Sequence, residues 1–305
     1  MIDWKNLLKG VLVGGIAGTV VGLGGFYIAE IPATHAMGPV MFILVPLAAG
    51  FAIAMVTRDR QTVPAAMLLA TIVSLAILIA SHTETPVCAL IAFPLLALGL
   101  LAGVGLGTIF HTLRVKLGGS GTTFTSLVLL SMPLLIFTGH RIEVSTLTHP
   151  RQEVVTTTIR LAADPSHVWN DLRSFDSVQG KKPLLMYIGL PIPMRCEMQG
   201  SGVGAKRTCY FDHGSIEETV IDWQPPNLMR LSIDRTNMPG RHWLDFEYAE
   251  YTLQQDGNDT ILTRNTTIIS NLYPAWYWRP FERWGVSSEH NYIFSDLVRR
   301  AQRQQ

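Results

Sequence analysis

Two adjacent glutamates, Glu217 and Glu218, lie in a segment of alternating polar and apolar side chains at residues 215 to 223. Neighbouring side chains of a strand point to opposite faces, so one of these carboxylates must face the apolar side. Ile216 and Val220 share a face with Glu218, which makes Glu218 the inward residue. Removal from water disfavours an ionised carboxylate, and proteins use this effect to make a ligand-orienting or acid/base group.

Two interpretations of Glu218 stay open. It forms a structural ion pair with Arg207 on the neighbouring predicted strand, or it orients a ligand or exchanges a proton, with Arg207 as a second polar contact. The remaining polar residues on or near these strands have no spacing typical of a Ser/His/Asp, Cys/His or paired-carboxylate site. They are His213, His242, Asp245 and Glu247.

Cys196 and Cys209 lie on either side of the glycine-rich turn at residues 200 to 204, at nearly equal distances from it. In a symmetric hairpin these residues are directly opposite each other on antiparallel strands. An extracytoplasmic compartment permits thiol oxidation. For a domain in such a compartment, we predict a cross-strand disulfide between Cys196 and Cys209.

Four histidines fall in or beside short polar segments that flank apolar stretches of the first half, and two glutamates lie near the first pair. Imidazole and carboxylate groups are ligands of Zn, Fe and Ni, but these residues have neither i, i+4 nor CxxC-type spacing. We therefore favour solvated polar loops and expect no metal and no other cofactor. The residues are His35, His82, His140, His149, Glu30 and Glu84.

Charged residues are distributed unevenly over the 305 residues. Residues 1 to 140 hold six basic and four acidic side chains, and residues 141 to 305 hold 18 basic and 19 acidic ones. The net charge of +1 gives no polycationic surface for a nucleic acid. We predict a membrane domain at 1–140, a linker at 141–150 and a soluble domain at 151–305.

Five stretches of the first half contain no Asp, Glu, Lys or Arg. Each is close to the ~20 residues that a helix needs to cross ~30 Å of hydrocarbon, so we expect five transmembrane helices. The stretches are residues 11–29, 38–57, 62–81, 86–110 and 120–138.

Basic residues in the short connections orient these helices. They flank the N-terminus and occupy the second and fourth connections, whereas the first and third have none; they are Lys5, Lys9, Arg58, Arg60, Arg114 and Lys116. Because Lys and Arg resist translocation, we expect a multi-pass protein of the cytoplasmic (inner) membrane with a cytoplasmic N-terminus and a periplasmic C-terminal domain. If residues 120–138, rich in Thr and Ser, were interfacial, the domain would be cytoplasmic.

Glycine recurs every four residues in the first and fourth apolar stretches. This spacing places a stripe without Cβ atoms on one helix face and lets two backbones approach closely. We expect both helices to pack tightly, either within one chain or between copies of a homo-oligomer. The glycines are Gly10, Gly14, Gly18 and Gly22 in the first stretch, and Gly99, Gly103 and Gly107 in the fourth.

The soluble half changes to period-two alternation, which is typical of strands. We expect a strand at 154–161, short helices after Asp164-Pro165 and at 183–188, six further strands and a long helix from Pro274 to near Gln302. The six strands lie at about 194–199, 205–212, 215–223, 228–235, 242–253 and 260–269. The expected buried side of the long helix consists of Phe281, Trp284, Ile293, Phe294, Leu297 and Val298.

Trp276, Tyr277 and Trp278 begin this helix beside Tyr273. Two interpretations of this aromatic cluster stay open. The rings form a plug of the core, or, being amphipathic, they settle at the headgroup level of a bilayer and make this end of the helix an entrance for a lipid.

Three motifs, in this order, resemble the START-like helix-grip superfamily, also called SRPBCC or polyketide cyclase/dehydrase and lipid-transport domains. The first is Ile159-x-x-x-Ala163-Asp164-Pro165-x-x-Val168-Trp169. The second is Gly202-x-Gly204-x-x-Arg207 followed by Gly214-x-Ile216-x-Glu218-x-Val220-x-x-Trp223-x-Pro225-Pro226-x-Leu228. The third is Tyr277-Trp278-x-Pro280 leading to His290. With the order of elements, the resemblance covers roughly residues 151–303.

The resemblance implies an α+β domain in which a curved antiparallel sheet grips the long helix around an apolar cavity for a lipid, sterol, polyketide or similar ligand. It does not imply catalysis. We therefore expect a membrane-anchored protein that binds or shuttles a hydrophobic ligand; the alternatives are a cyclase- or dehydratase-type enzyme and a sensory or assembly module. Expected ligand-binding residues are Glu218, Arg207, Trp243, Phe246, Phe281, Trp284, Ile293 and Phe294.

Overall fold

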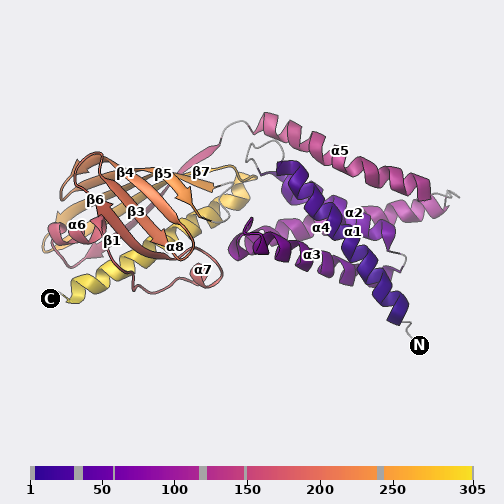
Figure 1. The fold of residues 1–305 in the computed structure, drawn as a ribbon, viewed down its shortest axis with the longest axis horizontal. Helices are drawn as coiled ribbons and strands as arrows, with labels where there is room; N and C mark the ends of the chain where they lie inside the picture. Colours follow the sequence, from indigo (N-terminus) through magenta and orange to yellow (C-terminus); the bar gives the residue numbers. More distant parts are fainter. Residues whose placement is uncertain are drawn as a thin grey trace. The chain divides into compact units, whose positions relative to one another are not determined.

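The chain divides into two compact units in a computed structural model (Figure 1). The helical unit comprises Met1–Glu84 and Cys88–His149, and the mixed unit comprises Thr85–Val87 and Pro150–Gln305. The structure describes residues 4–30, 37–57, 59–116, 122–147, 150–238 and 244–303.

The helical unit is built from long apolar helices. Pro64 lies in the first turn of one of them, where its missing N–H would have no intrahelical acceptor. The helices are α1 (Trp4–Glu30), η1 (Val40–Leu44) continuing into α2 (Val45–Val56), the short η2 (Arg60–Thr62), α3 (Val63–Ala80), α4 (Pro86–Lys116) and α5 (Thr122–Thr146).

Among the described residues, three helices are long and apolar enough to cross a membrane by length and composition, rather than the expected five. They lie at Trp4–Ala29, Arg60–Ala80 and Pro86–Leu113. Val40–Val56 is a shorter apolar helix, about 26 Å long against a hydrocarbon thickness of ~30 Å. Helix α5 is long, but it contains Thr and Ser throughout and polar residues near its end.

Glycines of α1 lie where this helix contacts α2 and α3. A Cβ added at Gly18 would lie 2.7 Å from Ile53 Cδ1 and 2.9 Å from Ala70 Cβ. At Gly14 an added Cβ would lie 2.5 Å from Thr57 Oγ1, whereas at Gly22 its contacts are looser, at 3.8 Å and beyond. The small residues thus allow close packing of α1 within one chain.

Helix α4 approaches α2 still more closely. A Cβ added at Gly103 would lie only 2.0 Å from the carbonyl oxygen of Leu47, and one at Gly99 would lie 2.7 Å from that of Ile43. At Gly107 the nearest atom would be Ala54 Cβ, at 2.7 Å. At Gly99 and Gly103, backbone atoms rather than flexible side chains occupy this space, so these two positions require glycine. The expected homo-oligomer stays a prediction.

The mixed unit is a seven-stranded antiparallel sheet with a long helix lying along it, as the yellow α8 in Figure 1 shows. The strand order β1-β7-β6-β5-β4-β3-β2 places the first strand beside the last. The strands are β1 (Arg151–Leu161), β2 (Pro193–Gln199), β3 (Lys206–Phe211), β4 (Ser215–Gln224), β5 (Leu228–Asn237), β6 (Leu244–Asp256) and β7 (Asp259–Ser270). The helices are α6 (Pro165–Arg173), α7 (Leu184–Tyr187) and α8 (Ala275–Arg303). This is the helix-grip fold expected from the sequence.

Local sequence signals explain several of these elements. The Asp164 side chain accepts the Ser166 N–H at 2.8 Å and caps α6, and Pro165 occupies its first turn. In β4, Glu218 is buried whereas Glu217 is exposed, as the alternation predicts.

The core lies between the inner face of the sheet and the helices α6 and α8. Ile293, Phe294 and Leu297 of α8 pack there with Trp169 of α6 and Leu231 of β5. Phe281 is only partly buried.

The expected position of Trp284 on the buried side of α8 is wrong, because its side chain is 46% exposed. Trp278, Glu282 and Val286 are buried at a spacing of four residues. With 3.6 residues per turn, a residue midway between Glu282 and Val286 points to the opposite side of the helix. The apolar nature of Trp284 therefore did not determine its orientation.

Candidate functional site

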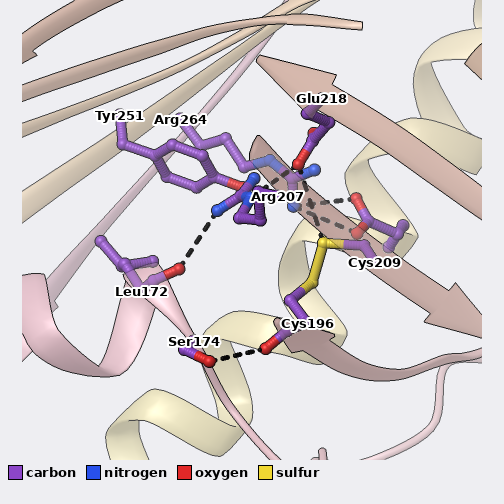
Figure 2. The surroundings of a disulfide bond; sticks show 9 residues. Leu172, Ser174, Cys196, Arg207, Cys209, Glu218, Tyr251 and Arg264 are labelled. Carbon is purple, nitrogen blue, oxygen red and sulfur yellow. Dashed lines mark hydrogen bonds and ion pairs between the residues drawn. A yellow bond between two sulfur atoms is a disulfide. The ribbon is translucent and has the colours of Figure 1, made fainter. Parts of the chain in front are cut away.

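An ion pair lies buried inside the mixed unit (Figure 2). Arg207 of β3 and Glu218 of β4 are directly opposite each other, and the two residues are 2% and 5% exposed. Arg207 Nε donates a hydrogen bond to Glu218 Oε2 at 2.6 Å. Its Nη1 donates to the Leu172 carbonyl at 3.1 Å, and its Nη2 to the Tyr251 hydroxyl at 3.4 Å.

The charge of Arg207 is stabilised in this buried position. Burial alone lowers the pKa of the guanidinium, but the charge of Glu218 and the hydrogen bonds from Arg207 raise it by more. The pKa of Arg207 therefore lies above its usual range, and the group is charged at every physiological pH.

A second buried arginine, Arg264 of β7, faces the same interior. Its Nη1 lies 2.9 Å from Oε2 of Glu289 on α8. The guanidinium carbons of Arg264 and Arg207 each lie 5.3 Å from the centre of the Tyr251 ring, within the range of a cation–π interaction. Burial lowers the pKa of Arg264, and the charge of Glu289 raises it by more, so the pKa is raised overall.

Arg264 Nε has no hydrogen-bond partner in the part of the chain that the structure describes, although the atom is buried. Leaving such a donor unsatisfied costs about 1–3 kcal/mol, and more when it carries charge. The interior thus holds a strong donor that could bind an oxygen acceptor of another molecule.

His290 of α8 is fully buried between two threonines. Its Nδ1 lies 2.9 Å from Thr157 Oγ1 and its Nε2 lies 2.8 Å from Thr266 Oγ1. Burial, with a smaller contribution from the charge of Arg264, lowers the pKa of His290 well below its usual value. The imidazole is therefore neutral at pH 7 and links α8 to β1 and β7.

Cys196 of β2 and Cys209 of β3 are opposite in the register and form a disulfide (Figure 2). Cys209 Sγ lies 3.7 Å from Glu218 Oε2, and Ser174 Oγ donates to the Cys196 carbonyl at 3.0 Å. The disulfide connects the edge strand to the strand that carries Arg207. It thereby restrains the backbone beside the ion pair.

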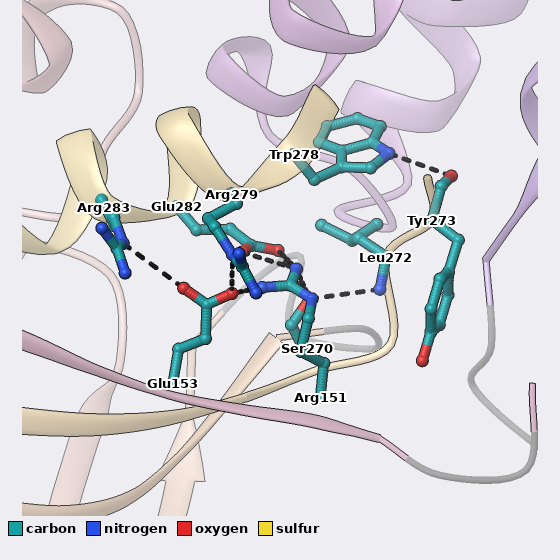
Figure 3. Close-up of polar contacts among 9 residues, drawn as sticks. All are labelled: Arg151, Glu153, Ser270, Leu272, Tyr273, Trp278, Arg279, Glu282 and Arg283. Atoms are coloured by element: carbon teal, nitrogen blue, oxygen red, sulfur yellow. Dashed lines mark hydrogen bonds and ion pairs between the residues drawn. The ribbon is translucent and has the colours of Figure 1, made fainter. Parts of the chain in front are cut away.

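A second polar cluster joins the start of β1 to the first turns of α8 (Figure 3). Arg151 donates to both oxygens of Glu282 at 2.7 and 2.8 Å and also binds Glu153. Arg279 Nε and Arg283 Nε donate to the two oxygens of Glu153. Burial raises the pKa of Glu153, but Arg279 and Arg151 lower it by more, so this carboxylate stays ionised.

The expected ligand-binding residues occupy different surroundings. Ile293 and Phe294 are buried in the core, Phe246 is partly buried and packs beside Val155 and Ile268, and Trp243 lies outside the described residues. Other polar residues of the interior were not among the expected site residues, although strand alternation places Arg264 on the same face as Leu262 and Thr266. They are Tyr251, Arg264, Glu289 and His290, of which only His290 belongs to one of the motifs described above.

The histidines expected near the membrane do not form a cluster in the part of the structure that is described. His140 Nδ1 lies 3.4 Å from Glu143 Oε2, and Glu143 Oε1 accepts the Val40 N–H at 3.0 Å, so these residues serve helix contacts. Among the described residues no three His, Cys, Asp or Glu side chains are arranged to hold a metal ion. His35 and His149 lie outside those residues.

Comparisons with known proteins give likeness of structure only. No protein-family model matches the sequence, and no curated protein matches it. Solved structures similar to this chain include norcoclaurine synthase from Thalictrum flavum (10% identity, TM-score 0.37, covering 53% of this chain and 93% of that one). The Zhui aromatase/cyclase from a Streptomyces species is 15% identical, with a TM-score of 0.36, covering 50% and 96%. A START superfamily protein from Mycobacterium smegmatis is 9% identical, with a TM-score of 0.36, covering 50% and 99%.

The fold assignment of the mixed unit rests on its own strand order and on the position of α8. By these features the unit is an α+β helix-grip domain. Its function has to be argued from its buried polar groups, because one fold hosts many functions.

Arg207→Met leaves Glu218 buried without its partner, so we expect it to lower the free energy of unfolding by about 3–5 kcal/mol. The double variant Arg207→Met/Glu218→Leu removes both charges and should recover most of that loss. Chemical unfolding of the full-length protein in detergent, followed by tryptophan fluorescence, measures the free energy of unfolding of each variant. If the loss in the double variant equalled the sum of the losses in Arg207→Met and in Glu218→Leu, the two residues would not be coupled.

His290 predicts a pH dependence of stability. The folded protein keeps this imidazole neutral, whereas the unfolded chain binds a proton below about pH 6.5. The free energy of unfolding should therefore decrease as the pH falls through that value, by at most ~1.4 kcal/mol per pH unit from this group. His290→Gln should remove this part of the slope, and His213→Gln, at an exposed turn, should not. If the free energy of unfolding had the same pH slope in the original protein and in both variants, His290 would not be the source of this pH dependence.

Proposed function

We propose that this protein is a membrane-anchored binding protein whose helix-grip domain holds or shuttles a hydrophobic ligand with a polar head. The Arg207–Glu218 pair, buried inside an apolar core, carries the proposal. Replacing such a pair by well-packed apolar residues is often neutral or stabilising, so fold stability alone does not explain its presence. A charged pair held in one orientation is a means of recognising a polar group.

The ligand's polar head would meet Arg207 and Arg264. These two cations face the same Tyr251 ring, and Arg264 Nε supplies a donor that no described residue accepts. The apolar part would lie among side chains of the sheet and α8 that include Ile293 and Phe294. Phe246 and Phe281, which are only partly buried, would line its margin.

A binding role is favoured over catalysis because the candidate acid/base is already engaged. Glu218 Oε2 accepts a hydrogen bond from Arg207 Nε at 2.6 Å, so this carboxylate oxygen is already occupied by a permanent cation. Both nitrogens of His290 contact threonine hydroxyls, so this imidazole has no ring nitrogen left for a substrate. The chemistry of the interior is therefore hydrogen bonding and ion pairing.

The apolar helices would anchor this domain at the cytoplasmic membrane. Lys5 and Lys9 before the first span favour a cytoplasmic N-terminus. An odd number of crossings, whether three or five, leaves the C-terminal domain on the opposite side. An oxidising compartment there would agree with the Cys196–Cys209 disulfide.

Organic extraction of the purified full-length protein, followed by mass spectrometry, tests the binding role. We expect a hydrophobic compound in amounts comparable to the protein. Glu218→Gln should reduce its amount or change its polar head, whereas Glu217→Gln, on the exposed face of the same strand, should leave it unchanged. A domain that is well folded and empty would contradict the proposal.

A reporter fused to the C-terminus tests the orientation. We expect alkaline phosphatase, which requires export, to be active in this fusion, and a reporter that works only in the cytoplasm to be inactive. The opposite result would place the domain in the cytoplasm, because it would mean an even number of crossings.

A further inference from the structure

The first turns of α8 expose an aromatic and basic face, which we call the Trp276–Trp284 face. Trp276 is 75% and Trp284 46% exposed, and the Arg279 and Arg283 side chains are 50% and 57% exposed. With Pro280, which is also exposed, these residues are spaced by three or four, so they share one side of the helix over about 12 Å.

The charge of this face is positive because its carboxylate partner is buried. Arg279 and Arg283 direct their Nε atoms to Glu153, whose side chain is 6% exposed. With Arg151 and Glu282, the cluster has three cations and two carboxylates, and its two most exposed members are both arginines (Figure 3). The half-exposed guanidinium groups therefore present positive charge to solvent.

This combination of side chains fits one kind of partner. Exposed indoles are favoured at the headgroup level of a bilayer, where one part of the ring is apolar and its N–H is hydrated. Guanidinium groups bind phosphate oxygens through two parallel hydrogen bonds. Apolar anchors beside basic residues on one side of a helix are typical of helices that lie on anionic membranes.

We propose that the Trp276–Trp284 face docks on a bilayer that contains anionic phospholipid, with the two indoles at the headgroup level and Arg279 and Arg283 binding lipid phosphate. This inference rests on the membrane anchoring of the proposed function. It goes beyond it by assigning the docking surface and its headgroup preference.

The test uses full-length protein in nanodiscs of phosphatidylcholine mixed with phosphatidylglycerol. A photoreactive benzoylphenylalanine replaces Trp276 and, in separate proteins, Leu98 of α4 and Val203 at the β2–β3 turn, all three of which are exposed. After irradiation, mass spectrometry identifies the adducts. We expect lipid adducts at positions 276 and 98 and none at 203. At 276, phosphatidylglycerol should be enriched about fivefold over its share of the disc, which corresponds to one net positive charge near the surface.

Two further proteins test the role of charge. Arg279→Gln/Arg283→Gln should reduce the enrichment at position 276 to the bulk ratio, and Arg279→Lys/Arg283→Lys should retain most of it. If the adducts at position 276 contained both lipids in their bulk ratio while Arg279 and Arg283 were unchanged, the headgroup preference would be overturned. Crosslinks between two chains at 276 would show that the face binds a second copy instead.

The position 98 protein separates the two proposals. Lipid adducts at 98 without adducts at 276 would overturn the docking face and leave the membrane anchor intact. Lipid adducts at neither position would overturn the anchor, and the docking face with it.

Discussion

Polar side chains on the inner face of β7 must find partners, and this requirement determines how α8 lies on the sheet. Arg264 pairs with Glu289, Thr266 with His290, and Ser270 Oγ donates to Glu282 at 2.6 Å. A shift of α8 by one turn, ~5.4 Å, would break all three contacts at once. Each group left unpaired in the interior costs about 1–3 kcal/mol, so one position of the helix is strongly preferred. Apolar contacts alone would tolerate sliding far better.

This position of α8 organises both candidate functional regions. On its buried side, the helix brings Glu289 to Arg264, which contacts the same Tyr251 ring as Arg207. On its other side, the first turns expose Trp276 and Trp284. A single rigid element thus has the proposed ligand interior on one side and the proposed docking face on the other.

Much of the mixed unit follows from local patterns. The strands, the Asp164 cap and the inward Glu218 depend only on neighbours in sequence, because strand alternation and helix capping are local effects. The same alternation places Arg264 on the inward face. The partners of these side chains were not predictable in this way. Arg151 and Glu282 are 131 residues apart, so only the folded chain brings them together.

The sequence by itself determined the two-part organisation, the order of strands and helices and which carboxylate of β4 faces inward, because these depend on composition and short-range periodicity. The tertiary structure decided what Glu218 pairs with, where α8 rests and that Trp284 faces outward. The physical reason is that a helix with apolar residues on several sides has no inward face until a sheet covers one of them.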